Sequence, residues 1–181
     1  MLYLASIPAC SGQKGTDEKA TGKGGAKMDI MITSPAFANN GPIPTVYTCD
    51  GENISPPIQW SGLPEETRSL ALICDDPDAP MKTWVHWVLY CIPPDCAELG
   101  EGVPNDEIIA NGAKHGSTDF GSPGYGGPCP PRGKPHRYFF KLYALDTMPD
   151  LEPGLTKKAL LKSMKGHILA SGELIGTYQR K

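Results

Sequence analysis

Residues 68–92 read RSLALICDDPDAPMKTWVHWVLYCI, and this stretch decides the fold. Apolar and β-branched side chains crowd into residues 68–74 and again into residues 85–92, which predicts two strands. Further strands are expected at residues 29–33, 137–145 and 173–178. The 21 glycines and 19 prolines, over a fifth of the 181 residues, favour turns and exclude a helical bundle. The pattern is typical of an antiparallel sandwich.

A single helix is expected, at residues 156–170. Thr156 is a suitable N-cap because its hydroxyl can accept from a backbone N–H of the first turn. The apolar stripe of this segment consists of every fourth residue: Leu160, Met164 and Ile168. Gly172 is expected to end the helix.

The charge balance and the cysteine spacing exclude several functions. The chain has a formal charge of −3, and residues 28–181 carry 13 basic and 18 acidic side chains, so no nucleic-acid-binding surface is predicted. No apolar run is long enough for a transmembrane helix. The cysteines lack the spacing of a zinc site, so neither a metal nor a cofactor is predicted. Disulfides among Cys49, Cys96 and Cys129 stay open.

The first 27 residues differ from the rest. Residues 1–10 (MLYLASIPAC) are apolar and end in a cysteine, and residues 11–27 are polar and rich in glycine. We therefore expect a disordered tail at residues 1–27 and one domain at residues 28–181. The apolar run resembles the end of a bacterial lipoprotein signal peptide with Cys10 lipidated, which would place the protein in the cell envelope; a frayed terminus on a cytoplasmic protein is the alternative.

Polar groups gather where the second strand begins. Residues 75–80 (DDPDAP) form an acidic turn that two prolines stiffen, which holds the carboxylates of Asp76 and Asp78 at an end of the sheet. Strict alternation puts Trp84 and His86 on one face of the next strand. The other face is expected to carry Val85, Trp87, Leu89 and Cys91. An acidic turn or a lone strand histidine is usually structural.

A second histidine stands in a similar setting. In HRYFFKLYA, which begins at His136, alternation places His136 and Tyr138 on the apolar face and Arg137 on the opposite face. An imidazole and a phenol at the rim of an apolar face are typical of a small-ligand pocket. The remaining histidines, His115 and His167, are interpreted as loop-edge or packing residues.

Residues 116–135 (GSTDFGSPGYGGPCPPRGKP) form a predicted loop of twenty residues, with six glycines and five prolines. In a compact domain, a loop of this length without secondary structure is more typical of a binding loop than of a simple connection. Gly126 and Gly127 would let backbone N–H groups approach an anion closely. The DFG triplet at residues 119–121 is not a kinase signature, because no glycine loop, strand lysine or HRD segment accompanies it.

Several of these motifs resemble the signature regions of the phosphatidylethanolamine-binding protein family. They are DPDAP at 76–80, Trp84-x-His86, and Pro130-Pro131-x-Gly133 leading into His136-Arg137-Tyr138. NISP at 53–56, TDFG at 118–121 and the single helix resemble the bacterial and archaeal branch, often described as Raf-kinase-inhibitor-like. The resemblance covers about residues 28–178. It implies a mainly β fold, a two-sheet antiparallel β-sandwich with one C-terminal helix and few short helices.

The resemblance also implies a small anion-binding pocket at one end of the sandwich. By position, the ligand-binding residues would be Asp76, Asp78, Trp84, His86, Cys129, His136 and Tyr138. The expected ligand carries a phosphate, carboxylate or phosphoethanolamine-like group. An aspartate that accepts from one histidine nitrogen would favour the imidazolium and turn the opposite N–H toward the anion. The other carboxylate and the face of Trp84 would receive an ammonium group.

Three functions fit this sequence. The preferred one is a non-enzymatic ligand-binding protein, without catalytic residues, that can modulate a partner protein. The second is an inhibitor of a protein kinase or serine protease that acts through the pocket rim and residues 116–135. The third is a weak phosphoester hydrolase, although no serine or cysteine in the loop has the setting of an activated nucleophile.

Overall fold

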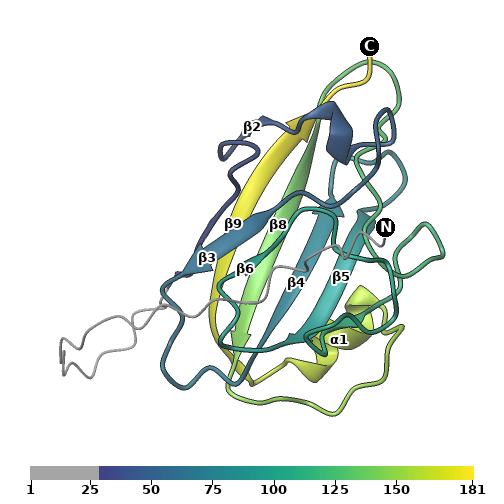
Figure 1. The fold of residues 1–181 in the computed structure, drawn as a ribbon. Coiled ribbons are helices and arrows are strands. Elements are labelled where there is room, and N and C mark those ends of the chain that lie inside the picture. The colour runs from purple at the N-terminus through teal and green to yellow at the C-terminus, as the bar shows by residue number, and fades with distance from the viewer. Residues whose placement is uncertain (1–28) are drawn as a thin grey trace, which may run out of the picture.

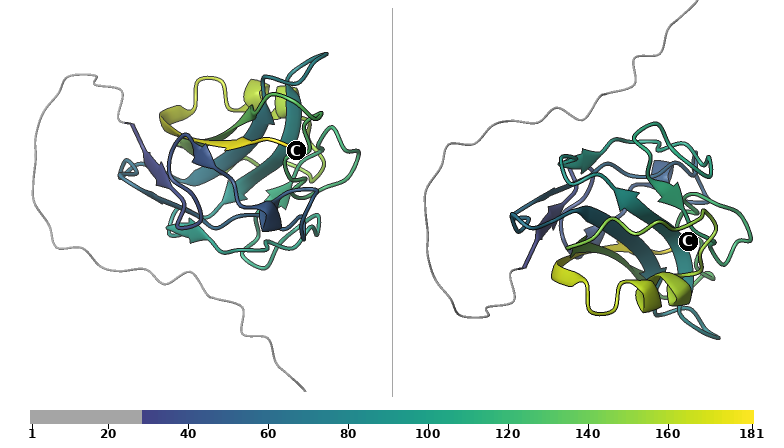
Figure 2. Two further views of the ribbon diagram at one scale, coloured as in Figure 1. Left: turned by 90° about the horizontal axis from the view of Figure 1, so that it is seen from above. Right: turned by 90° about the horizontal axis from the view of Figure 1, so that it is seen from below.

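The computed structural model describes residues 29–181, whose strands form two sheets that enclose a common core (Figures 1 and 2). The larger sheet has the order β2-β9-β8-β4-β5-β7 and the smaller has the order β1-β3-β6. The strands are β1 (Met31–Thr33), β2 (Gly41–Pro42), β3 (Ile58–Ser61), β4 (Ser69–Asp76), β5 (Trp84–Ile92), β6 (Glu98–Leu99), β7 (Lys114–His115), β8 (His136–Leu145) and β9 (Ile168–Tyr178). All neighbours are antiparallel except β2 and β9. The predicted class, a mainly β fold of two sheets, is confirmed.

The main core lies between the two sheets. The side chains that alternation on β8 assigns to one face are all fully buried there: Tyr138, Phe140, Leu142 and Ala144. They share this core with Ile32, Trp60 and Leu99 of the smaller sheet. Full burial of one large apolar side chain is worth about 2 kcal/mol, so this interface supplies much of the driving force for folding.

The opposite face of the large sheet is covered by helix α1 (Lys157–Ser163), as the views of Figure 2 show. Leu160 and Met164 are buried in a second apolar cluster on this face, together with side chains of β4 and β5. Thr156 is the N-cap, and its side chain accepts from the backbone N–H of Ala159 at 3.2 Å. The predicted start of the helix is confirmed.

The prediction that this helix continues to residue 170 is wrong. The helix ends at Ser163, and Gly166 has a φ of 88°, which only glycine adopts without strain. The chain then enters β9 at Ile168, so Ile168 belongs to a strand rather than to the helical stripe. The chain therefore leaves the helical segment at Gly166, and not at Gly172 as predicted.

β5 departs from strict alternation because it is bulged. Its register against β4 shifts twice, once at His86 and once near Cys91, where φ is 55°. Trp87 and Leu89 consequently lie in the main core. Val85 and Cys91 instead pack on the other face, in the cluster beneath α1. The prediction that these four side chains share one face is wrong, because each bulge inserts a residue that reverses the alternation.

Within residues 29–181, no helix is long and apolar enough to cross a membrane. Cys10 and the expected N-terminal tail lie outside the described residues.

His115 is a buried structural residue at the edge of the large sheet. Its Nδ1–H donates to the carbonyl of Asp106 at 2.6 Å, and its Nε2 accepts from the indole N–H of Trp87 at 3.0 Å. These two hydrogen bonds require the neutral imidazole ring, in which Nδ1 carries the proton and Nε2 carries the lone pair. Burial lowers the pKa of His115 below its ordinary 6.5, because a second proton would be poorly solvated and would displace the Trp87 bond.

We predict that the free energy of unfolding falls as the pH decreases below about 6.5. Below that pH, His115 binds a proton more readily in the unfolded chain than in the folded chain, so acid favours unfolding. Urea unfolding at several pH values measures the effect. His115→Gln should show a shallower dependence, with a remainder from His86, whose pKa is also lowered. Equal slopes for the two proteins would contradict this role of His115.

Candidate functional site

A cavity of about 290 Å³ opens where three strands of the large sheet meet. β4 ends at Asp76, β5 begins at Trp84 and β8 begins at His136. Because β4 is antiparallel to both neighbours, its end lies beside their beginnings. The lining residues are Asp76, Ala79, Pro80, Trp84, His86, Phe120, Cys129, Pro130, Pro131 and His136. Five of the seven predicted ligand-binding residues are therefore brought together.

His136 is held in place by Asp76. Its Nδ1 lies 2.7 Å from Oδ2 of Asp76, and the two side chains are only 11% and 4% exposed. The other carboxylate oxygen accepts from the backbone N–H of Asp78 at 2.8 Å. Both oxygens of Asp76 are thus engaged, and the orientation of the His136 ring is fixed.

His86 is anchored differently, by the backbone of the long loop. Its Nδ1 lies 2.6 Å from the carbonyl oxygen of Gly126, and because a carbonyl only accepts, Nδ1 carries the proton. The backbone N–H of Gly126 donates back to the carbonyl of His86 at 2.9 Å. Burial lowers the pKa of His86, against the opposing effects of the Gly126 backbone and the charge of Asp76. The ring is therefore neutral at pH 7, with its lone pair on Nε2.

The second nitrogen of each ring is open to the cavity. Nε2 of His86 and Nε2 of His136 have no hydrogen-bond partner within residues 29–181. In that range the only fully buried side-chain nitrogen or oxygen without a partner is the Tyr138 hydroxyl, so solvent must reach both Nε2 atoms. Since both rings line the cavity, their Nε2 atoms are the polar groups it can offer to a ligand.

Phe120 completes the apolar wall and was missed as a site residue by the sequence analysis. Its ring stands edge-on to Trp84, with centroids 5.6 Å apart, and to His86 at 5.3 Å. The preceding Asp119 positions it by accepting from the backbone N–H of Val85 at 2.7 Å. No periodicity marks an aromatic side chain in a loop. The available signal is that Phe120 is one of only two aromatic residues, with Tyr125, in a segment rich in glycine and proline.

Asp78 does not line the cavity. Its two carboxylate oxygens accept from Nε and Nη2 of Arg137 at 2.9 and 2.7 Å. These bonds lower the pKa of Asp78 to about 2. Asp75 is also turned away, and it is buried beside Lys141 and Lys157. Within residues 29–181, no three His, Cys, Asp or Glu side chains are grouped closely enough to hold a metal ion.

Tyr138 lies behind His86 rather than among the lining residues. The two rings meet edge to face with centroids 5.1 Å apart, and Tyr138 is fully buried. Burial raises the pKa of its hydroxyl far above 10, so it stays a donor. Within residues 29–181 this hydroxyl is buried without a hydrogen-bond partner, which is unusual for a buried hydroxyl.

The expectation that Gly126 and Gly127 offer free backbone N–H groups is wrong. The N–H of Gly126 donates to the carbonyl of His86, and the N–H of Gly127 donates to Oδ1 of Asn53 at 2.8 Å. Glycine is needed here for space: a Cβ at Gly127 would lie 2.4 Å from the carbonyl oxygen of Tyr47. These residues shape the wall of the cavity and do not supply its donors.

A disulfide between Cys49 and Cys129 ties this wall to the segment after η1 (Thr45–Tyr47). The two cysteines are 80 positions apart, and Cys129 lines the cavity. A crosslink that closes a long loop restricts the unfolded chain strongly, so the wall is held by a covalent bond as well as by hydrogen bonds. The sequence left this pairing open.

The fold and the cavity together define a β-sandwich protein with a pocket of about 290 Å³ at one end of its larger sheet. The phosphatidylethanolamine-binding protein family matches residues 33–179. A UPF0098 protein of Methanothermobacter thermautotrophicus is 58% identical over 151 residues, which are 83% of this chain and 99% of the relative. A UPF0098 protein of Pyrococcus horikoshii is 47% identical over 163 residues, 88% of this chain and 81% of the relative. The chain belongs to the phosphatidylethanolamine-binding protein family.

Solved structures agree with this assignment. A homologue from Chlamydia trachomatis, CT736, has a TM-score of 0.78 and 42% sequence identity, covering 84% of this chain and 99% of that chain. Escherichia coli YbcL, described as a new member of the mammalian family, has a TM-score of 0.78 and 33% identity, covering 86% and 100%. The resemblance seen in the sequence motifs is confirmed.

Proposed function

We propose that the cavity binds a small anion, a phosphate or carboxylate group, through Nε2 of His86 and Nε2 of His136. The observation that carries this proposal is that each ring uses Nδ1 to contact the protein and leaves Nε2 without a partner in the cavity. Rings that are oriented before the ligand arrives lose little entropy on binding. A volume of about 290 Å³ suits a headgroup-sized ligand.

Binding of an anion requires the cavity to take up a proton. When both rings are neutral, the only charge among the lining side chains is that of Asp76, which repels an anion. Nε2 of neutral His86 carries a lone pair and cannot donate. An anion that accepts from Nε2 stabilises the imidazolium, so ligand binding and protonation of His86 favour each other.

A separate ammonium site has little support. Asp76 is engaged by His136 and by the turn backbone, and Asp78 is engaged by Arg137. The ring of Trp84 already lies 5.5 Å from the ammonium group of Lys82. We therefore assign the affinity for a group such as phosphoethanolamine to its phosphate and not to its amine.

The lining favours binding over covalent catalysis. Among the described residues that line the cavity there is no serine, threonine or lysine, and the only sulfur atom, that of Cys129, is in a disulfide. Ser117 of the long loop donates to the carbonyl of Gly154 at 2.7 Å. Nothing on the described rim selects a kinase or a protease, so inhibition of either is not proposed.

Replacement of His136 by alanine should weaken binding of phosphate and phosphoethanolamine by about tenfold or more, because one charge-assisted hydrogen bond is lost. Isothermal titration at about pH 6 measures this, because a lower pH favours the proton uptake that anion binding requires. His167→Ala is the matched control, since His167 also contacts an aspartate, Asp146, at 2.8 Å but is exposed and does not line the cavity.

The proposal fails if the unaltered protein binds neither compound, or if His136→Ala and His167→Ala bind equally well. Release of inorganic phosphate from phosphoethanolamine during the same incubation would instead support the hydrolase hypothesis.

The affinity for sulfate should rise as the pH decreases from about 8 to about 5.5. Sulfate keeps its charge over this range, so a change in affinity reports protonation of the protein. The lowered pKa of His86 means that this ring is unprotonated at the upper end in the free protein, and the bound anion must supply the free energy for its protonation. His86→Gln should reduce the dependence. A pH-independent affinity in the unaltered protein would contradict proton uptake.

A further inference from the structure

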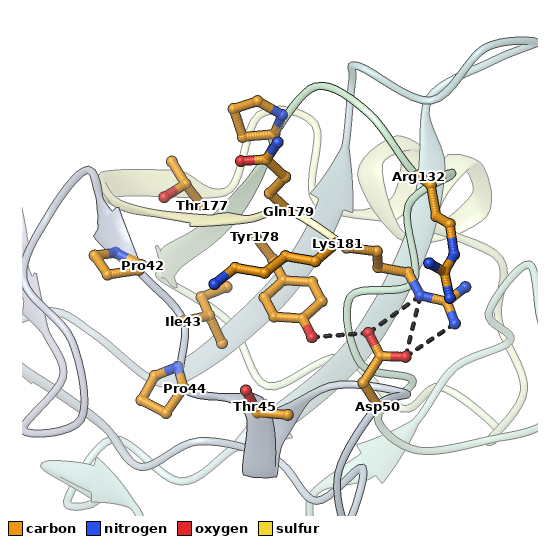
Figure 3. A pocket seen from close by; sticks show the side chains of 12 residues that line it. Pro42, Ile43, Pro44, Thr45, Asp50, Arg132, Thr177, Tyr178, Gln179 and Lys181 are labelled. Atoms are coloured by element: carbon orange, nitrogen blue, oxygen red, sulfur yellow. Dashed lines mark hydrogen bonds and ion pairs between the residues drawn. The ribbon is translucent and has the colours of Figure 1, made fainter.

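A second and larger cavity, of about 890 Å³ (Figure 3), is bordered by the same loop as the cavity lined by His86 and His136, which we call the anion pocket. It runs between residues 42–45 and the residues that end β9 and follow it, and Arg132 and Pro135 border it. We call it the basic groove. It shares no lining residue with the anion pocket. The loop contributes to both, because Arg132 lines the groove and its neighbour Pro131 lines the pocket.

The basic groove has more positive than negative side chains. Arg132, Arg180 and Lys181 line it, and Asp50 is its only acidic side chain. This differs from residues 28–181 as a whole, where acidic side chains outnumber basic ones by 18 to 13. The groove is therefore a local site of positive potential on an acidic protein.

Asp50 neutralises only part of this charge. It accepts from Nε of Arg180 at 3.1 Å and from the hydroxyl of Tyr178 at 2.8 Å. Arg132 extends toward the same carboxylate in Figure 3, and its charge contributes to the lowered pKa of Asp50, after the larger effect of the Tyr178 bond. Within the described residues, however, neither Arg132 nor Lys181 makes a hydrogen bond or an ion pair. These two cations are available to a ligand.

The opposite wall of the groove is apolar and has few backbone donors. It consists of Pro42, Ile43 and Pro44, and the N–H of Ile43 already donates to the carbonyl of Thr177 at 2.8 Å. Proline has no N–H, so this edge of the sheet cannot pair readily with an added strand. A ligand must be recognised through side chains, by charge on one wall and by apolar contact on the other.

We propose that the basic groove is a docking site for an acidic peptide segment of a partner protein, with one carboxylate bound by Arg132 and an apolar side chain packed against Pro42, Pro44 and Tyr178. The volume is about three times that of the anion pocket, which favours several linked residues over a single anion. Arginine binds carboxylates in a bidentate manner, whereas the net acidic charge of the domain disfavours a long polyanion. This site is independent of the proposed function of the anion pocket.

Fluorescence anisotropy with a labelled peptide of alternating glutamate and leucine tests the proposal, and the same peptide with glutamine in place of glutamate is the charge control. The acidic peptide should bind and the glutamine peptide should not. Arg132→Gln should weaken binding about tenfold, as expected for loss of a charge-assisted bidentate contact. Lys134→Gln, on the same loop but outside the groove, should leave it unchanged. Added salt should weaken binding.

The proposal is overturned if the two peptides bind alike, if Arg132→Gln has no effect, or if neither peptide binds. It is also overturned if sulfate or vesicles of anionic phospholipid bind with the same dependence on Arg132, because the groove would then be a general anion or membrane site. His136→Ala separates the two proposals. It should weaken phosphate binding about tenfold or more while peptide binding persists, so failure at one site does not imply failure at the other.

Discussion

The hydrogen bond between Nδ1 of His136 and Asp76 is the interaction on which the site depends. It joins residues 60 positions apart, the last of β4 and the first of β8. The antiparallel register of these strands, in which Asp75 pairs with Phe139, places the two side chains together at one edge of the sheet. The bond engages the carboxylate, fixes the ring and leaves Nε2 in the cavity. Antiparallel pairing thus joins residues of two separate sequence motifs into one binding group.

The two histidines perform related tasks in different electrostatic surroundings. The His136 ring is held by a carboxylate, and the His86 ring is held by the Gly126 carbonyl in a more buried place, where its pKa is lowered. β5 has a bulge at His86, directly before the core residue Trp87. Bulges of this kind commonly redirect a side chain next to a binding site. Affinity for an anion is consequently tied to proton uptake, which sets a pH dependence that a permanently charged arginine would not show.

The features that were predicted correctly from the sequence are those that depend on local periodicity. On β8 the alternating face and the outward position of Arg137 followed from the pattern, and so did the N-cap Thr156. On β5 the same reasoning failed, because bulges depend on the pairing with β4. The carbonyl of Gly126, the position of Phe120 and the Cys49–Cys129 pairing involve partners that are distant in sequence. Contacts of this kind require the tertiary structure.

Nitrogen-15 NMR of the histidine side chains, in the free protein and in the protein saturated with sulfate at about pH 7, tests the central claim most directly. The account predicts that free His86 is neutral with its proton on Nδ1, and that on sulfate binding its Nε2 takes up a proton from solvent, so that His86 becomes an imidazolium ring. A free His86 with its proton on Nε2, or a His86 ring whose protonation does not change at saturation, would contradict it.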